Sequence, residues 1–310
     1  MRTVNNISQY DKKKPTAITI GTFDGVHIGH QKILERLIND AKTKDRASAV
    51  LTFFPHPRMV LQQDSDIKLL NTLAEKQQIL ERMGLDFLIV HPFTKAFSRL
   101  TATEYVRDVL VNGLQAKKVT IGYDHRFGRN RTADINDLVG FGDMYDFEVE
   151  QIDAQEIDAV SISSTKIRRA LSEGDIRTAN TYLGYPYMLS GTIRKGKGIG
   201  RQLAFPTANI EIAESYKLIP RNGAYVVRST IDGNTVFGMM NIGTNPTVKP
   251  DNPQTIEVHY LDLDRDLYDC DVQVELLHWL REEQKFDSVD LLKEQLHADR
   301  AKARSLIADL

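Results

Sequence analysis

The chain has 310 residues, of which 41% are hydrophobic and 26% charged, and its formal net charge is −2 at pH 7. This composition is typical of a soluble globular protein with room for two domains, and the small net charge argues against a broad surface for nucleic acid. Cys270 is the only cysteine, which excludes an intrachain disulfide and a cysteine-based zinc cluster. The polar N-terminal stretch lacks the apolar core of a signal peptide, and no window of about eighteen residues is wholly apolar. A cytoplasmic location is therefore expected.

The first half of the chain alternates apolar, β-branched runs with helical patterns. Strands are predicted at 17–20, 49–54, 87–90, 118–121 and 147–152, and helices at 31–38, near 72–83 and near 102–112. Strands separated by helices imply right-handed βαβ crossovers and a parallel sheet, in which ligands bind beyond the carboxyl ends of the strands. Residues 21–30, 55–58 and 122–128 directly follow strands, so we expect them to share one edge of the sheet.

The segment Gly21–His30, GTFDGVHIGH, joins the first of these strands to the first helix. Its glycines let the backbone approach a ligand closely, and the helix start presents unpaired N–H groups that suit a phosphate. His27 and His30 are three residues apart, so both imidazoles lie on one side of the first turn. There they can donate hydrogen bonds to charge that develops on a phosphoryl group.

HIGH within this segment resembles the signature of the HxGH nucleotidyltransferase superfamily, and its longer form is similar to bacterial bifunctional riboflavin kinase/FAD synthetases. The resemblance implies a Rossmann-like FMN adenylyltransferase domain with catalytic His27 and His30. It also implies nucleotide contacts at Gly21, Thr22, Phe23, Asp24, Gly25 and Gly29. Class I aminoacyl-tRNA synthetases share HIGH, but neither their KMSKS-type loop nor a long tRNA-binding extension is visible here, so tRNA charging is a distant alternative.

A second motif, Ile162–Arg168, opens a predicted helix over about 165–182. Taken alone, its hydroxyls indicate a helix N-cap, which is compatible with binding a triphosphate. The motif resembles the ISSTxIR element of flavin adenylyltransferases. That resemblance implies that Ser163, Ser164 and Thr165 bind the nucleotide and that Arg168 is catalytic.

Two strand-end segments, 55–58 and 121–128, resemble the PHPR and VGxDFxFG elements of the same family. The resemblance implies flavin contacts at His56, Arg58, Asp124 and Phe127. His125 stands where the family usually has Phe, and residues 130–134 lack a glycine usual before the acidic residue. Both departures lie in or beside a segment expected to contact the flavin, and neither lies in a segment expected to bind ATP.

The character of the chain changes near Tyr182–Pro186, and we place the domain boundary between residues 183 and 184. Short strands are predicted at 187–193, 224–229, 236–240, 255–261 and 272–277, with a turn at 232–234 and a final helix over about 288–308. Closely spaced strands with turns indicate a small antiparallel barrel.

Within this second domain, residues 191–201 alternate glycines with cationic residues, a pattern that can cradle phosphates but does not match the Walker motif. The PTAN sequence that follows, Pro206–Asn209, resembles the riboflavin kinase motif. The resemblance implies that Thr207 and Asn209 bind ATP-associated Mg²⁺, whose preference for oxygen ligands these side chains satisfy. It further implies nucleotide contacts at Lys195, Gly196, Gly198, Gly200 and Thr207.

Three later segments resemble the remaining kinase elements in the family's order: 223–225, 241–247 and 280–286. The resemblance implies that Glu257 is the catalytic base and that Arg281, with the terminal helix, borders the flavin.

The complete interpretation is an N-terminal α/β nucleotidyltransferase, residues 1–183, followed by an antiparallel β-barrel riboflavin kinase, residues 184–310. The expected ligands are riboflavin, FMN, ATP and Mg²⁺. The expected protein has neither a nucleic acid nor a membrane partner and is a monomer or weak homo-oligomer. Two alternatives stay open: an enzyme with one degenerate module, and a non-catalytic regulator that binds flavin or RNA.

Overall fold

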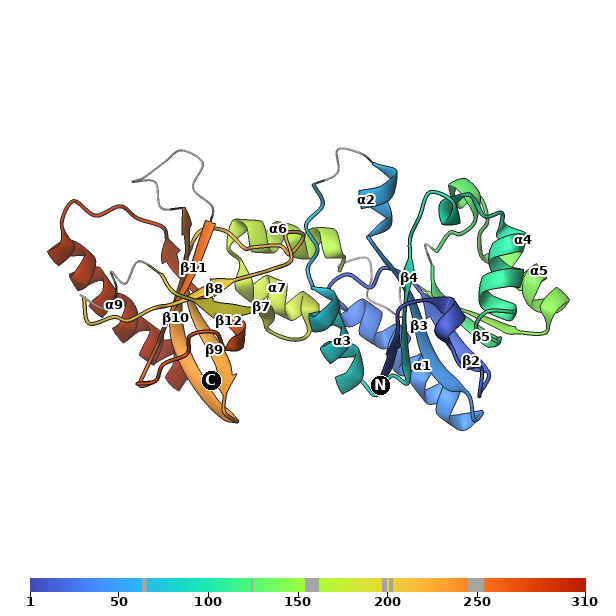
Figure 1. Cartoon of the computed structure of the whole chain (residues 1–310), viewed down its shortest axis with the longest axis horizontal. Helices are drawn as coiled ribbons and strands as arrows, with labels where there is room; N and C mark the ends of the chain where they lie inside the picture. The colour runs from blue at the N-terminus through green and yellow to red at the C-terminus, as the bar shows by residue number, and fades with distance from the viewer. Residues whose placement is uncertain (63–65, 124, 154–161, 197–199, 201–202, 245–253) are drawn as a thin grey trace. The chain divides into compact units, whose positions relative to one another are not determined.

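The computed structural model describes residues 1–62, 66–123, 125–153, 162–196, 200, 203–244 and 254–310. Its internal contacts divide the chain into two units, Met1–Ser164 and Thr165–Leu310. In Figure 1 the first unit is coloured from blue to green and the second from yellow-green to red. Among the described residues, no helix combines the length and apolarity needed to cross a membrane.

The first unit is built on a parallel sheet of six strands in the order β1-β4-β3-β2-β5-β6. The strands are β1 (Arg2–Val4), β2 (Thr16–Ile20), β3 (Ala47–Phe54), β4 (Phe87–Pro92), β5 (Ala116–Gly122) and β6 (Glu148–Ile152). β2 is buried along its whole length, as expected for a central strand of a covered parallel sheet. The predicted parallel sheet is therefore confirmed.

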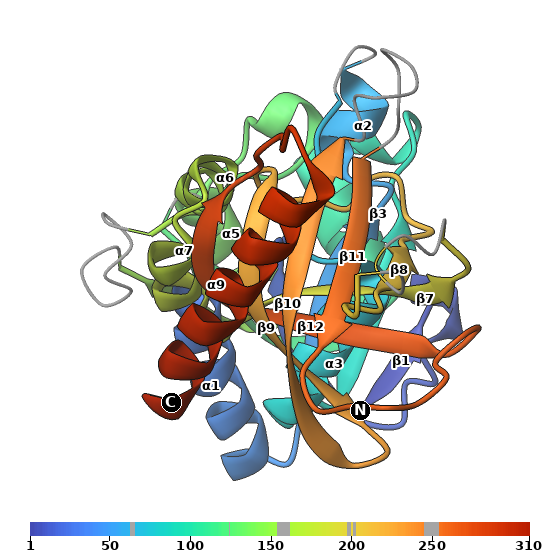
Figure 2. The ribbon, with the colours of Figure 1, turned by 90° about the vertical axis from the view of Figure 1, so that its left-hand side faces the viewer.

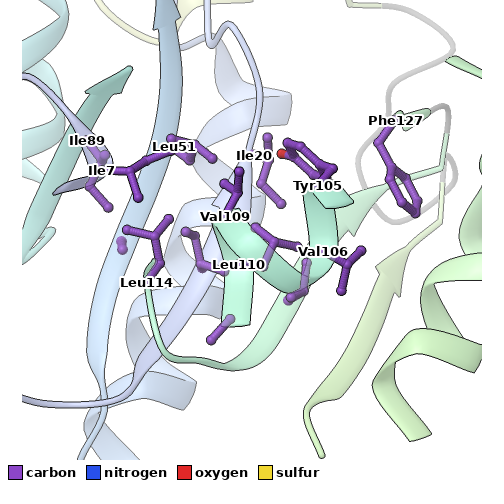
Figure 3. Packing of buried hydrophobic residues seen from close by; sticks show 14 of the residues in the cluster. Ile7, Ile20, Leu51, Ile89, Tyr105, Val106, Val109, Leu110, Leu114 and Phe127 are labelled. Atoms are coloured by element: carbon purple, nitrogen blue, oxygen red, sulfur yellow. The ribbon is translucent and has the colours of Figure 1, made fainter. Parts of the chain in front are cut away.

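Helices and helical turns connect these strands. They are η1 (Ile7–Gln9), α1 (Ile28–Thr43), α2 (Pro57–Leu61), α3 (Leu73–Arg82), η2 (Phe97–Arg99), α4 (Ala102–Glu104), the π-helix η3 (Tyr105–Val111), η4 (Arg129–Arg131) and α5 (Ile135–Tyr145). Apolar side chains of η3, among them Val106 and Leu110, pack against β-strand residues such as Ile20 and Leu51 in one hydrophobic cluster (Figure 3). This cluster forms a hydrophobic core of the first unit.

The second unit contains a closed antiparallel barrel in the order β10-β11-β8-β7-β12-β9. Its strands are β7 (Tyr187–Arg194), β8 (Ala208–Glu211), β9 (Gly223–Ile231), β10 (Asn234–Thr244), β11 (Gln254–Tyr260) and β12 (Asp271–Glu282). Helices α6 (Ser164–Glu173) and α7 (Ile176–Leu183) precede the barrel. The terminal helix α9 (Val289–Ala308) runs along β9 and β10 (Figure 2), where Ala303 joins a buried cluster with Phe205 and Met239. The predicted barrel with a terminal helix is confirmed.

Several local predictions were wrong or incomplete. The single helix predicted over 165–182 is two helices, because Gly174 adopts φ +82° and Asp175 caps α7 through its side chain. The helix near 102–112 is a short α4 followed by a π-helix. β1 and β8 were not predicted, since each is short and depends on pairing with strands distant in sequence. The boundary at 183/184 stays a prediction.

Candidate active sites

The signature segment forms a strained turn between β2 and α1. His27 is the N-cap residue of α1, and Gly25 has φ +87°. Phe23 and Val26 also have positive φ values, of 45° and 35°, which is an unusual conformation for a β-branched residue such as Val26. Both side chains are almost fully buried, so packing offsets the strain. The turn is thus held rigidly where the sheet meets the helix start.

The two signature histidines stack on each other. Their ring centroids are 3.7 Å apart with an interplanar angle of 17°, and the His30 ring also lies 4.8 Å from that of Phe23. Within the described residues, neither buried Nδ1 atom has a hydrogen-bond partner. The sequence prediction that both imidazoles lie on one side of the turn agrees with this geometry, and their hydrogen-bonding capacity is available to a ligand.

Both histidines are electrically neutral near pH 7. Burial lowers the pKa of His27 to about 4. Burial also holds the pKa of His30 well below its ordinary value, with further lowering by His27 and Lys76. A neutral imidazole can donate a hydrogen bond to a phosphate through its N–H group. Two neutral rings also do not repel each other across the stack.

Ser164 connects the second motif to the signature turn. Its hydroxyl donates to the backbone carbonyl of Asp24 at 2.9 Å, although the two residues are 140 positions apart. The Asp24 carboxylate is buried and accepts a 2.9 Å hydrogen bond from the backbone N–H of Leu70. Asp24 therefore ties the turn both to the start of α6 and to the segment before α3. Arg168 follows Ser164 by one helical turn on α6.

The predicted flavin residues of the first unit occupy two strand ends. β3 and β5 both pair with β2 in parallel, so their carboxyl ends meet at one edge, as expected. His56 is the N-cap of α2, where its Nδ1 accepts from the backbone N–H of Arg58 at 3.2 Å. Phe127 is buried, with its ring centroid 5.9 Å from that of Tyr105. Asp124 lies outside the described residues, and flavin binding at these positions stays a prediction.

In the barrel, the PTAN segment meets the predicted catalytic base. The Thr207 hydroxyl donates to Glu257 Oε2 at 3.0 Å. Asn209 on β8 stands opposite Glu257 on β11 in the antiparallel register. A hydroxyl, an amide and a carboxylate therefore converge across two adjacent strands, and these oxygen donors fit the preference of Mg²⁺.

Two described glycines of the glycine-rich segment, Gly196 and Gly200, lie close to residues 205–209. A Cβ at Gly196 would lie 2.1 Å from the Asn209 amide nitrogen, and one at Gly200 would lie 2.3 Å from the Phe205 carbonyl oxygen. At Gly200 a side chain would therefore meet the backbone, whereas at Gly196 it would displace the Asn209 side chain. Lys195 is exposed, with its ammonium 5.9 Å from the centroid of the Tyr268 ring, and Gly198 lies outside the described residues.

Arg281 is engaged in a partly buried ion pair. Its Nε and Nη2 atoms contact the Asp299 carboxylate of α9 at 2.9 and 2.8 Å, and Asp299 is 5% exposed. The Nη1 atom donates to the carbonyl of Glu282. Arg281 thus anchors the terminal helix to β12, and its contact with the flavin stays a prediction.

Two polar residues near these sites were missed from sequence. Lys76 on α3 donates to the Thr22 carbonyl at 2.6 Å, and the ring of His259 on β11 shares a 2.9 Å hydrogen bond with the Pro206 carbonyl. A lysine on an amphipathic helix ordinarily faces solvent, so no local pattern singled out Lys76. His259 lies two residues after Glu257, and that period-two spacing is the signal that could have pointed to it.

Both units match known protein families. A family model described as FAD synthetase matches residues 9–166, and one described as riboflavin kinase matches residues 183–307. The chain is 39% identical to the bifunctional riboflavin kinase/FMN adenylyltransferase of Listeria monocytogenes, over 94% of this chain and 93% of that protein. It is 35% identical to the protein of the same name from Escherichia coli, over 98% and 96%.

A solved structure has the same fold over almost the whole chain. The crystal structure of a macrolide-efflux protein from Streptococcus pneumoniae superposes with a TM-score of 0.88, is 30% identical and covers 98% of both chains. The two family models match consecutive parts of the chain, and the relatives match almost its whole length. Together these matches identify the family. The chain belongs to the family of bifunctional riboflavin kinase/FMN adenylyltransferases.

Proposed function

We propose that this chain phosphorylates riboflavin to FMN and then adenylylates FMN to FAD, with ATP as the donor in both steps. The observation that carries the proposal is the presence of two separate polar constellations, one in each unit. The stacked His27 and His30 lie within the range of the FAD synthetase model, and the Thr207–Glu257 pair lies within that of riboflavin kinase.

In the kinase step, the riboflavin 5′-hydroxyl oxygen attacks the γ-phosphorus of ATP, and the bond from that phosphorus to the β–γ bridging oxygen breaks. Glu257 takes the hydroxyl proton, and ADP leaves. The hydrogen bond from Thr207 keeps the carboxylate oriented beside the PTAN segment. Mg²⁺, held by the Thr207 and Asn209 oxygens, would supply charge neutralisation at the phosphates when bound.

In the adenylyl-transfer step, an oxygen of the FMN phosphate attacks the α-phosphorus of ATP, and pyrophosphate leaves. Little covalent help is needed, so alignment and stabilisation of charge on the α-phosphoryl oxygens supply most of the catalysis. We assign this role to His27 and His30. The hydroxyls of Ser163, Ser164 and Thr165, together with Arg168, would bind the β- and γ-phosphates.

The chemistry calls for small-molecule ligands alone. We therefore keep the expectations of a cytoplasmic protein, monomeric or weakly self-associating, without a nucleic acid or membrane partner. Sedimentation of the purified protein with and without flavin and ATP would test the oligomeric state.

Product analysis tests the two assignments together. With riboflavin and Mg-ATP, His30→Ala should accumulate FMN and lose at least about 100-fold of FAD formation, because a group that stabilises transition-state charge has been removed. Glu257→Ala should make no FMN from riboflavin yet adenylylate supplied FMN. Chromatography of flavins separates the products. Loss of both reactions in either folded variant would contradict the modular assignment.

A further inference from the structure

A buried lysine lies directly beneath the signature turn. Lys76 is 5% exposed, and its ammonium donates to the Thr22 carbonyl at 2.6 Å across 54 positions of sequence. A capping box between Thr72 and the buried Glu75 fixes the first turn of α3. The lysine is therefore presented to the turn from a rigid helix rather than from a flexible surface.

The ammonium has an acidic neighbour in the same turn. Asp24 is 3% exposed, and its charge raises the pKa of Lys76 against the larger lowering effect of burial. A buried charge is costly, so an ammonium in this position is a weak way to stabilise the fold. Asp24 also accepts hydrogen bonds from Leu70 and Ser164, and Lys76 donates to Thr22, so the segments that carry these donors are fastened to the same turn.

Lys76 also acts on the histidine pair. The groups whose charge influences His30 are His27, the N-cap residue of the same helix, and Lys76 from α3, and both lower the pKa of His30. The lysine thus favours the neutral imidazole and adds a positive field close to the site of the triphosphate.

We propose that Lys76 is a positioning residue for adenylyl transfer: its ammonium fixes the Thr22 carbonyl and adds positive charge at the signature turn that leads to His30. The inference rests on the proposed function, since it assigns the residue to the same site. It differs from a purely structural role, in which Lys76 would only attach α3 to the turn and its loss would act through stability alone.

The test uses the full-length protein and two substitutions. Lys76→Met keeps an unbranched side chain but removes the charge and the donor, whereas Lys76→Arg keeps both. Adenylylation of supplied FMN is measured as a function of pH, with riboflavin phosphorylation by the same polypeptide as an internal control. Lys42→Met, on the exposed face of α1, is the matched surface control.

We expect Lys76→Met to lower kcat for adenylylation on the order of 10- to 100-fold while leaving riboflavin phosphorylation unchanged. The acidic limb of its pH profile should move to higher pH, because removal of the neighbouring cation makes His30 easier to protonate. Lys76→Arg should restore the wild-type limb. If Lys76 were merely structural, its replacement would lower thermal stability without moving the acidic limb.

Two outcomes overturn the inference: unchanged adenylylation in Lys76→Met, or lower activity with an unshifted acidic limb. If the wild-type protein itself makes no FAD from FMN and ATP, the proposed function fails instead. The two failures are therefore distinguishable in one set of assays.

Discussion

At the scale of single residues, the signature histidines combine burial with unused hydrogen-bonding capacity. Stacking places their rings 3.7 Å apart, and burial opposes protonation of either one. A buried polar atom without a partner costs about 1–3 kcal/mol, which a bound phosphate can offset. The arrangement therefore costs the free protein some stability, as expected if the proposed anion site is here.

This arrangement predicts a pH dependence of stability. Because the pKa of His27 falls from 6.5 unfolded to about 4 folded, the unfolded chain binds more protons between these values. The free energy of unfolding should thus fall as the pH drops from 6.5 toward 4, with a contribution from His27 of about 3 kcal/mol. Above pH 6.5 this contribution stays constant.

Urea unfolding of the wild type and of His27→Asn over this pH range measures the effect. The asparagine cannot titrate, so the difference between the two proteins isolates His27 from the other histidines. We expect the wild type to lose more stability on acidification than the variant. Parallel curves would show that His27 titrates alike in the folded and unfolded chain.

At the scale of elements, the break between α6 and α7 shows where local patterns stop being informative. Apolar residues with helical spacing continue through Gly174, and this periodicity predicts one helix. The structure ends α6 there because the left-handed backbone of Gly174 fits against the Trp279 ring of β12. That contact joins positions more than a hundred residues apart, and no local window contains both.

Substitution of Gly174 tests this account. In Gly174→Ala the new Cβ would have positive φ and lie 2.9 Å from Trp279 ring atoms. Strain and overpacking together should lower the free energy of unfolding by about 2–4 kcal/mol. Gly233→Ala is the control, because that glycine has φ +80° with nothing within 4 Å of an added Cβ. It should cost only about 1 kcal/mol.

Chemical denaturation of both variants gives the comparison. The larger loss in Gly174→Ala would isolate the contact with Trp279 from the backbone strain that both alanines share. Equal losses would mean that the tryptophan moves freely and that backbone conformation alone ends α6.

At the scale of the whole molecule, the two polar constellations proposed to be catalytic belong to separate units, and only a chemical intermediate is proposed to link them. FMN is the product proposed for the Thr207–Glu257 site and the substrate proposed for the His27–His30 site. Each unit has its own hydrogen-bonded network and its own hydrophobic core. We therefore expect each reaction to proceed in a chain whose other site is inactive.

A mixture of two inactive variants tests this independence. His30→Ala and Glu257→Ala should each fail to make FAD from riboflavin, but together they should succeed, because FMN released by the first is adenylylated by the second. FAD formation followed by flavin chromatography is the measurement, with each variant alone as the control. A mixture that accumulates FMN without FAD, although Glu257→Ala accepts supplied FMN, would contradict the prediction.

The sequence by itself determined the two fold classes, their order along the chain and the family. Those properties depend on local periodicity and on short motifs, such as GTFDGVHIGH and PTAN, whose residues are neighbours in the chain. Tertiary structure alone decided the placement of Lys76 beneath Thr22, of His259 against Pro206 and of Arg281 on Asp299. Each of these contacts joins side chains and partners from separate elements, so burial and packing, rather than the local pattern, select the partner.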